Sequence, residues 1–172
     1  MAETEKGGPP AYPPGAVHMA RSAASAQMHL SRMADQKASI LMGASFVIFT
    51  LAVGHSEGKS APLPLLILGG AAFLSAVLAA LAVLPAVSYR KGAPLNLLFF
   101  GSFARLEEEE YIERLLVELQ SDDRMYRTMA RDIYQNGIVL ARKKYRLLGW
   151  AYRIFLAGLT ASLAAFVVEA LL

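Results

Sequence analysis

The sequence predicts an all-α membrane protein with three transmembrane helices and long cytoplasmic helical extensions. Three apolar stretches, at 38–54, 63–87 and 154–172, carry this prediction, and the only charged residue within them is Glu169. About 20 apolar residues at ~1.5 Å of rise each cross the hydrocarbon layer as a helix. Lipid offers no hydrogen bonds to a backbone, so each stretch has to satisfy its own as a helix. Composition agrees, because 18% of the residues are charged, against about 25% in soluble domains.

The N-terminal part predicts one helix that enters the membrane without a break. Residues 1–16 contain two Pro-Pro pairs and predict a disordered tail. Residues 17–37 predict a cytoplasmic helix that continues into the first transmembrane helix at 38–54, because no glycine or proline occurs between residue 17 and Gly43. A cleaved signal peptide would place its apolar core much nearer to residue 1, so we expect none.

The next segments predict a hairpin in the membrane followed by a cytoplasmic region. Residues 55–62 predict a short external loop, and residues 63–88 predict the second transmembrane helix, with Pro85 near its cytoplasmic end. Residues 89–149 predict a cytoplasmic helical region. Its apolar segment 95–103 is too short to span a bilayer, so we expect it against the membrane surface or beneath the cytoplasmic helices.

Two helices are predicted within this cytoplasmic region. Residues 105–120 are amphipathic, because Tyr111, Leu115 and Leu119 recur every four residues. The four adjacent glutamates at its start suit the positive end of the helix dipole. They point around the helix rather than at one ion, so we predict no metal site. Ser121 is a good N-cap for the next helix, which we expect to run into the third transmembrane helix at 150–172.

The lysines and arginines predict how the chain is oriented. Of the 17 basic residues, four precede the first span and twelve lie at 90–153, which leaves only Lys59 in the predicted external loop. Basic residues are retained on the cytoplasmic side of a membrane. We therefore expect the N-terminus in the cytoplasm and the C-terminus outside.

Little in the sequence points to catalysis. The chain has no cysteine and only three histidines. It also lacks the motifs of nucleophilic hydrolases, zinc proteases and phosphate-binding loops. We predict no enzyme activity, no catalytic residue and no cofactor. Membrane lipid is the first expected partner, and no binding to a nucleic acid polymer is expected.

Small residues recur every four positions in the second and third spans. The repeats are Ala72, Ala76 and Ala80, then Ala157, Ala161 and Ala165, with Glu169 continuing the second. Small residues let helices approach closely in lipid. Two interpretations stay open: packing within one chain, or assembly of a homo-oligomer in which Glu169 lines an aqueous path.

The helix expected from Asp122 onward carries polar residues along an apolar stripe. The stripe consists of Tyr126, Met129, Ile133, Asn136, Leu140 and Lys144. One interpretation is a buried Asn136 that fixes helix register, with Lys144 reaching the membrane surface. The other is a polar pocket in which neighbouring arginines complement an anionic ligand. Those arginines are Arg124, Arg127 and Arg131.

Several short motifs follow one another in a set order between residues 20 and 172. They are Asp35-Gln36-Lys37-Ala38-Ser39 at the entry to the first span, Phe99-Phe100-Gly101, Glu110-Tyr111, and segment 138–145 ending in Lys144-Tyr145. This order resembles the Pycsar effector transmembrane family. The resemblance implies a small bacterial effector of antiphage defence in the inner membrane. Such an effector would respond to cyclic UMP or cyclic CMP and would impair that membrane.

The resemblance also implies a polar layer just inside the cytoplasm that couples ligand to helix rearrangement. The residues of this layer are Asp35, Lys37, Asn136, Lys144 and Tyr145. An arginine or lysine would hold the cyclic phosphate, and Tyr134 or Tyr145 would stack on the pyrimidine. The ordinary alternative is a structural ion pair between Asp35 and Lys37.

A second function stays open beside the effector. The chain could be a non-toxic membrane scaffold or accessory subunit that holds a cytoplasmic partner through the amphipathic helix at 105–120.

Overall fold

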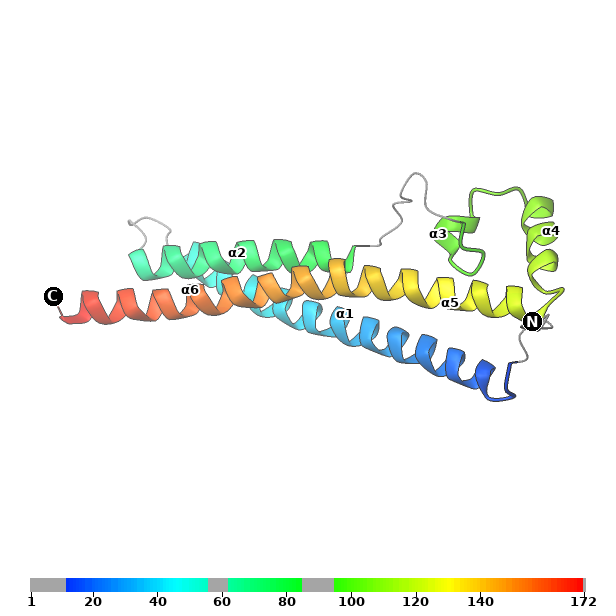
Figure 1. Ribbon diagram of the computed structural model, residues 1–172. Helices are drawn as coiled ribbons and strands as arrows, with labels where there is room; N and C mark the ends of the chain where they lie inside the picture. Colours follow the sequence, from blue (N-terminus) through cyan, green and yellow to red (C-terminus); the bar gives the residue numbers. More distant parts are fainter. Residues whose placement is uncertain (1–11, 56–61, 85–94, 172) are drawn as a thin grey trace, which may run out of the picture. The chain divides into compact units, whose positions relative to one another are not determined.

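The computed structural model describes residues 12–55, 62–84 and 95–171, and this described part is helical with no strand (Figure 1). Its elements are α1 (Ala16–Gly54), α2 (Leu63–Val83), α3 (Phe100–Phe103), α4 (Glu108–Glu118), α5 (Asp122–Val139), the π-helical stretch η1 (Leu140–Tyr145) and α6 (Arg146–Leu171). Within these described ranges, three helices are long and apolar enough to cross a membrane: α1, α2 and the continuous helix Asp122–Leu171. The predicted all-α membrane fold is therefore confirmed.

The chain divides into two compact units, each described by itself below. The polar unit consists of Met1–Met28 and Ala86–Ile138, and the membrane unit consists of His29–Pro85 and Val139–Leu172. Both predicted long helices are present, as α1 and as the run from α5 through η1 to α6. Most of the predicted N-terminal tail and of the external loop lies outside the described residues.

Helix α2 ends earlier than the predicted limit of the second span at residue 88. Its last residue is Val83, and Leu84 is extended, with φ −53° and ψ 132°. The ring of a following proline disfavours helical geometry in the residue before it, and residue 85 is a proline. The prediction placed Pro85 inside the span, whereas the described helix stops before this residue.

The core of the membrane unit is built from small residues on three helices. Ala34, Ala38 and Leu41 of α1 lie in one buried cluster with Ala79 and Ala82 of α2 and with Leu148 and Ala151 of α6. In Figure 1, α2 runs alongside α6. Two buried serines join these helices: Ser75 Oγ donates to the Ala151 carbonyl at 2.9 Å, and Ser162 Oγ donates to the Pro64 carbonyl at 2.7 Å. Such contacts need closely spaced backbones, which small residues allow.

The polar unit is held together by a buried asparagine in the segment before α3. Asn96 is 1% exposed, and its amide nitrogen donates to Asp132 Oδ1 at 2.9 Å and to Gln135 Oε1 at 3.1 Å. Its side-chain oxygen accepts from the Leu98 amide at 3.0 Å. Segment 95–103 is therefore attached to α5, which agrees with one of its two predicted positions.

Helix α4 is shorter than predicted and is little buried. It covers Glu108–Glu118 instead of residues 105–120, and Glu107 is its N-cap. None of its residues is buried, and Ile112, Leu116 and Val117 are exposed apolar residues on it. Ser121 caps α5 as predicted, because its hydroxyl accepts from the Arg124 amide at 3.3 Å.

Candidate functional site

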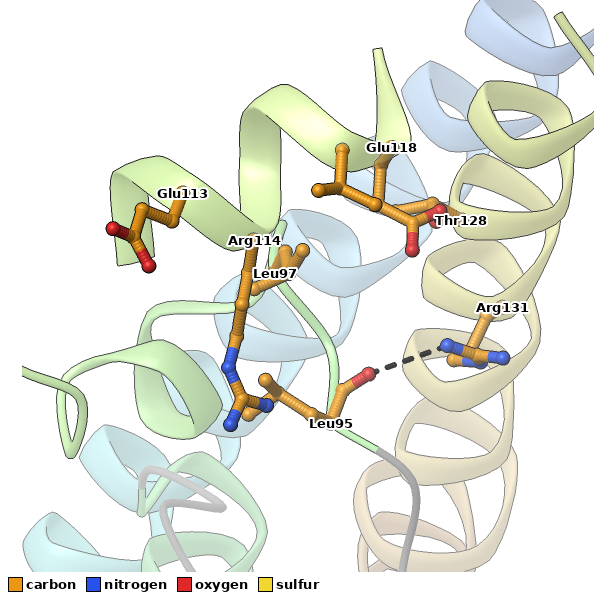
Figure 2. Close-up of a pocket in the computed structure, with 8 residues that line it drawn as sticks. Leu95, Leu97, Glu113, Arg114, Glu118, Thr128 and Arg131 are labelled. Carbon is orange, nitrogen blue, oxygen red and sulfur yellow. Dashed lines mark hydrogen bonds between the residues drawn. The ribbon is translucent and has the colours of Figure 1, made fainter. Parts of the chain in front are cut away.

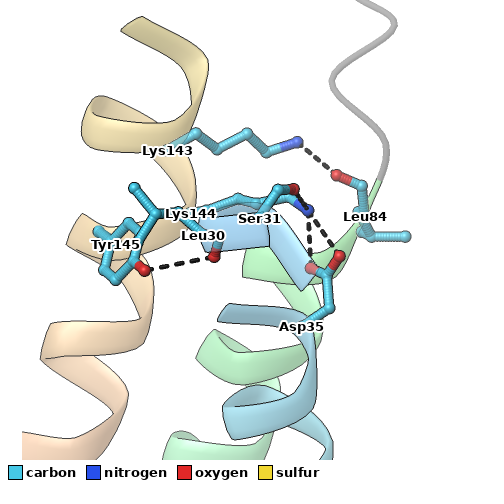
Figure 3. A network of polar contacts seen from close by, with 7 residues as sticks. All are labelled: Leu30, Ser31, Asp35, Leu84, Lys143, Lys144 and Tyr145. Carbon is cyan, nitrogen blue, oxygen red and sulfur yellow. Dashed lines mark hydrogen bonds and ion pairs between the residues drawn. The ribbon is translucent and has the colours of Figure 1, made fainter. Parts of the chain in front are cut away.

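A polar junction connects three helices of the membrane unit at η1 (Figure 3). Three consecutive residues of η1 reach other helices. Lys143 Nζ donates to the Leu84 carbonyl at 2.8 Å. Lys144 Nζ donates to both carboxylate oxygens of Asp35, at 2.7 and 2.8 Å, and to Ser31 Oγ at 2.8 Å. The Tyr145 hydroxyl donates to the Leu30 carbonyl at 3.3 Å. We call these contacts the η1 junction.

The hydrogen-bonding groups of the η1 junction are suited to hold α1 and α2 against η1. An ammonium group has three N–H donors, and the two Asp35 oxygens and the Ser31 hydroxyl supply acceptors for Lys144. Its side chain is only 18% exposed, so removal of one partner should cost more than it would for an ion pair at a water-exposed surface. Leu84 caps α2, where the last carbonyls lack helical partners, and Lys143 satisfies one of them. Short π-helical stretches of this kind are frequent at functional sites.

The structural pair that we considered for Asp35 has a different partner. Asp35 binds Lys144 on η1, whereas the expected alternative joined Asp35 to Lys37. Residues two apart on a helix do not face each other, and Lys37 is exposed. Only the backbone carbonyl of Lys37 has a described contact, from the Tyr152 hydroxyl at 3.2 Å.

The candidate ligand residues on α5 lie in the polar unit and have separate environments. Asn136 donates to Asp132 Oδ1 at 2.9 Å, so it belongs to the network around Asn96. Arg131 donates to the Leu95 carbonyl at 3.5 Å. Tyr134 is 70% exposed. The polar layer predicted from the sequence therefore consists of two groups, because Asp35, Lys144 and Tyr145 belong to the membrane unit.

Arg127 is occupied by an ion pair rather than directed at a pocket. Its Nε lies 2.7 Å from Asp123 Oδ2, and the Tyr12 hydroxyl donates to the other oxygen at 2.8 Å. The hydrogen bonds from Arg127 and then from Tyr12 hold the pKa of the Asp123 carboxyl below its ordinary value. The rings of Tyr12 and Tyr126 also contact each other at a tilt of 45°, with centroids 4.3 Å apart. These contacts attach residue 12 to the start of α5.

A pocket opens between α4, α5 and the segment before α3 (Figure 2). Its volume is about 390 Å³, and its lining consists of Leu95, Leu97, Glu113, Arg114, Val117, Glu118, Thr128 and Arg131. At one end the Thr128 hydroxyl donates to Glu118 Oε2 at 2.8 Å. At the other end Arg131 approaches the Leu95 carbonyl, and Arg114 extends toward the same segment. We call this cavity the α4–α5 pocket.

Sequence reasoning missed most residues of these two sites. Only Arg131 of the pocket, and Asp35, Lys144 and Tyr145 of the η1 junction, were candidates. The missed residues with clear roles are Ser31, Glu118 and Thr128 in these sites, and Asn96 and Asp132 in the buried network of the polar unit. Asn96 carried a usable signal, because a single asparagine stands within an apolar run, and a polar side chain there has to find partners when it is buried.

Some members of the small-residue repeats are buried between helices, and others are exposed. Ala72 is 1% exposed, and Gly69 and Gly158 also lie at buried positions where helices meet. Ala80, Ala157 and Ala161 are exposed, and so is Glu169. Ala72 therefore packs within one chain, whereas Ala157 and Ala161 of the repeat on α6 are exposed and Ala165 is half-buried. The repeat that includes Ala157 and Ala161 stays a prediction for assembly.

Comparison with known proteins gives one consistent result. A family model described as a Pycsar effector protein domain matches residues 18–170. The chain is also 36% identical over 109 residues to the Pycsar effector protein PtPycTM of Propioniciclava tarda. That alignment covers 59% of this chain and 52% of the relative, so the chain spans about half the length of the curated relative it matches. No solved structure matches significantly.

Proposed function

The chain belongs to the Pycsar effector protein family, and from this premise we propose that it is an antiphage defence effector of the bacterial inner membrane. We further propose that it responds to a cyclic pyrimidine mononucleotide, cyclic UMP or cyclic CMP, and impairs that membrane. The observation that carries the proposal is the match of nearly the whole chain to the family, on a protein with three helices able to span a bilayer.

The η1 junction supports a role in coupling. It holds α1 and α2 against the helix that becomes α6, through a charge pair and two carbonyl contacts. Ligand could bias two arrangements of these helices, and a shift from 1:99 to 99:1 takes about 5.5 kcal/mol of differential binding. One charge-assisted hydrogen bond contributes about 1.5–3 kcal/mol, so several groups or several subunits have to act together.

Assembly of several copies would let several subunits contribute to the differential binding energy. Ala157, Ala161 and the half-buried Ala165 form an outward repeat on α6 together with Glu169. We propose that this face packs against a second copy, where close approach of small residues stabilises helix pairs in lipid. Glu169 would then lie near the end of a helix interface, a position in which an ionisable group can line a water path.

We predict that the orientation follows the basic residues, with the N-terminus in the cytoplasm and the C-terminus outside. A reporter that is active only outside the cytoplasm should work when it is fused after Leu172 or inserted at 56–60. The same reporter should be silent when it is inserted beside Ser121. Activity at Ser121 would reverse the proposed topology.

The main prediction of the proposed function is leakage that depends on ligand. Purified protein in vesicles of bacterial phospholipid should release an entrapped dye after addition of cyclic UMP or cyclic CMP, and cyclic AMP serves as the control nucleotide. Release should be at least about tenfold faster with the cognate ligand, as a shift of about 1.4 kcal/mol in the population would give. Vesicles that stay intact with both pyrimidine nucleotides, and cells that stay viable with a pyrimidine cyclase, would refute the effector proposal.

One observation favours the scaffold as a second candidate. The apolar side chains of Ile112, Leu116, Val117 and Leu119 are all exposed on or beside α4. An apolar face on an amphipathic helix is a common site for a partner protein. A scaffold would keep this surface occupied and would leave vesicles intact under every nucleotide, so the leakage experiment separates the two functions.

A further inference from the structure

We propose that the α4–α5 pocket is the ligand site, with the phosphate of a cyclic pyrimidine nucleotide at its arginine end and the base at its Glu118–Thr128 end. This inference rests on the proposed function for the class of ligand. The position of the site rests on the pocket itself, which has Arg114 and Arg131 at one end and Glu118 at the other, with Glu113 also in its lining (Figure 2).

The arginine end of the pocket has N–H donors that could bind an anion. Within the described residues, the guanidinium of Arg131 has one contact, the Leu95 carbonyl at 3.5 Å, which is at the outer limit of a hydrogen bond. A guanidinium has five N–H donors in a planar fork that matches a phosphate. Arg114 adds a second positive charge and is paired with Glu110 at 2.6 Å. A compact monoanion at this end would replace a weak contact by charge-assisted ones.

The opposite end is suited to an N–H donor. Thr128 is 7% exposed, and its hydroxyl fixes one oxygen of Glu118. A positioned carboxylate accepts hydrogen bonds but repels a phosphate. Both candidate pyrimidines offer a donor at their edge: uracil has a ring N–H, and cytosine has an exocyclic amine. A ligand that is anionic at one end and donor-bearing at the other satisfies both ends, which inorganic phosphate cannot do.

The walls and the size agree with a nucleotide. Leu95, Leu97 and Val117 line the space between the two ends, and an apolar wall suits the face of a ribose or a base. The volume of about 390 Å³ lies within the range of roughly 300–1,000 Å³ that is usual for small-molecule sites.

The pocket is also connected to the buried network of the polar unit. Arg131 precedes Asp132, which accepts hydrogen bonds from both Asn96 and Asn136. A ligand that draws Arg131 away from the Leu95 carbonyl would act on the segment that Asn96 attaches to α5. Because α5 continues as one helix into η1, the ligand would act on the helix that carries Lys144.

Binding of labelled cyclic UMP and cyclic CMP to the full-length protein in nanodiscs tests this site. Arg131→Gln should weaken binding of the cognate nucleotide by about tenfold to a hundredfold, as loss of a charge-assisted contact does. Glu118→Gln should also weaken binding, and it should change the ratio of the two affinities, because uracil and cytosine present different donors. Arg114→Gln should give a smaller loss. Arg21→Gln removes the same charge from an exposed position on α1 and should bind like the wild type.

The outcomes separate this inference from the proposed function. If the wild type binds neither nucleotide, the proposed function fails. If the wild type binds one of them and the Arg131→Gln and Glu118→Gln variants bind it equally well, the pocket is the wrong place and the proposed function stands. Thermal unfolding of each variant serves as the folding control, and a variant that unfolds early is replaced by Arg131→Lys, which keeps the charge but loses the planar fork.

Discussion

Replacement of Gly158 by alanine is expected to force α2 and α6 apart and to destabilise the membrane unit by about 2 kcal/mol or more, as overpacking of a core does. An added Cβ at this position would overlap the Cβ of Ala71 on α2, and the backbone at Ala71 lies only 3.5 Å away. Rigid backbone on both sides leaves no flexible side chain to move. The neighbouring bond from Ser162 to the Pro64 carbonyl should lengthen with the separation.

The chain supplies matched controls for this substitution. Gly149→Ala has no atom within 4 Å of its new Cβ, so it should unfold at or above the wild-type temperature, because alanine favours a helix over glycine. The double variant Gly158→Ala with Ala71→Gly exchanges the two side chains across the interface and should recover most of the loss. Thermal unfolding of the purified protein in detergent measures all three. A Gly158→Ala variant as stable as the wild type would show that the helices separate without cost.

The sequence was sufficient for features that depend on local pattern. The continuity of α1 followed from the absence of glycine and proline between residue 17 and Gly43, and the start of α5 followed from the cap at Ser121. The end of α2 was also readable, because a proline acts on the residue before it, although the prediction let the span pass Pro85. These signals work because backbone geometry within a helix is set over a few residues.

The candidate site depends on contacts between residues far apart in the sequence, and a local sequence pattern does not reveal such contacts. Lys144 meets Asp35 across 109 positions of sequence, and Asn96 meets Asp132 across 36. The helix periodicity placed Asn136 and Lys144 on one stripe, yet the first belongs to the network of the polar unit and the second to the η1 junction. Lys144 lies within the π-helical stretch η1, which alters the spacing of side chains along the helix, and no feature of residues 140–145 in the sequence predicted it. The resemblance pointed to Asp35 and Lys37 of α1, and Asp35 lies in the η1 junction, but the resemblance did not give Lys144 as its partner.

Removal of the Lys144 charge is expected to release the η1 junction and to cause leakage without ligand. Lys144→Met leaves Asp35 without its partner, and the lysine side chain is 18% exposed while that of Asp35 is 39% exposed. Breaking a fully buried pair costs about 3–5 kcal/mol and an exposed pair contributes about 0–1, so we expect a loss of about 1–3 kcal/mol for this half-buried one. Vesicles with the variant should release dye before any nucleotide is added.

A double-mutant cycle decides whether the ion pair between Lys144 and Asp35 is responsible for the loss of stability and the leakage. Asp35→Asn alone should also leak, and Lys144→Met with Asp35→Asn should be less destabilised than the sum of the two single changes, because the uncompensated charge is gone. The control Arg32→Met removes an exposed charge from the same helix and should leave both unfolding and leakage unchanged. If Lys144→Met is destabilised but its vesicles stay closed until ligand is added, the junction stabilises the bundle without restraining it. If it neither unfolds earlier nor leaks, then the contacts from Lys143 and Tyr145 alone are sufficient to hold α2 and α1 in place.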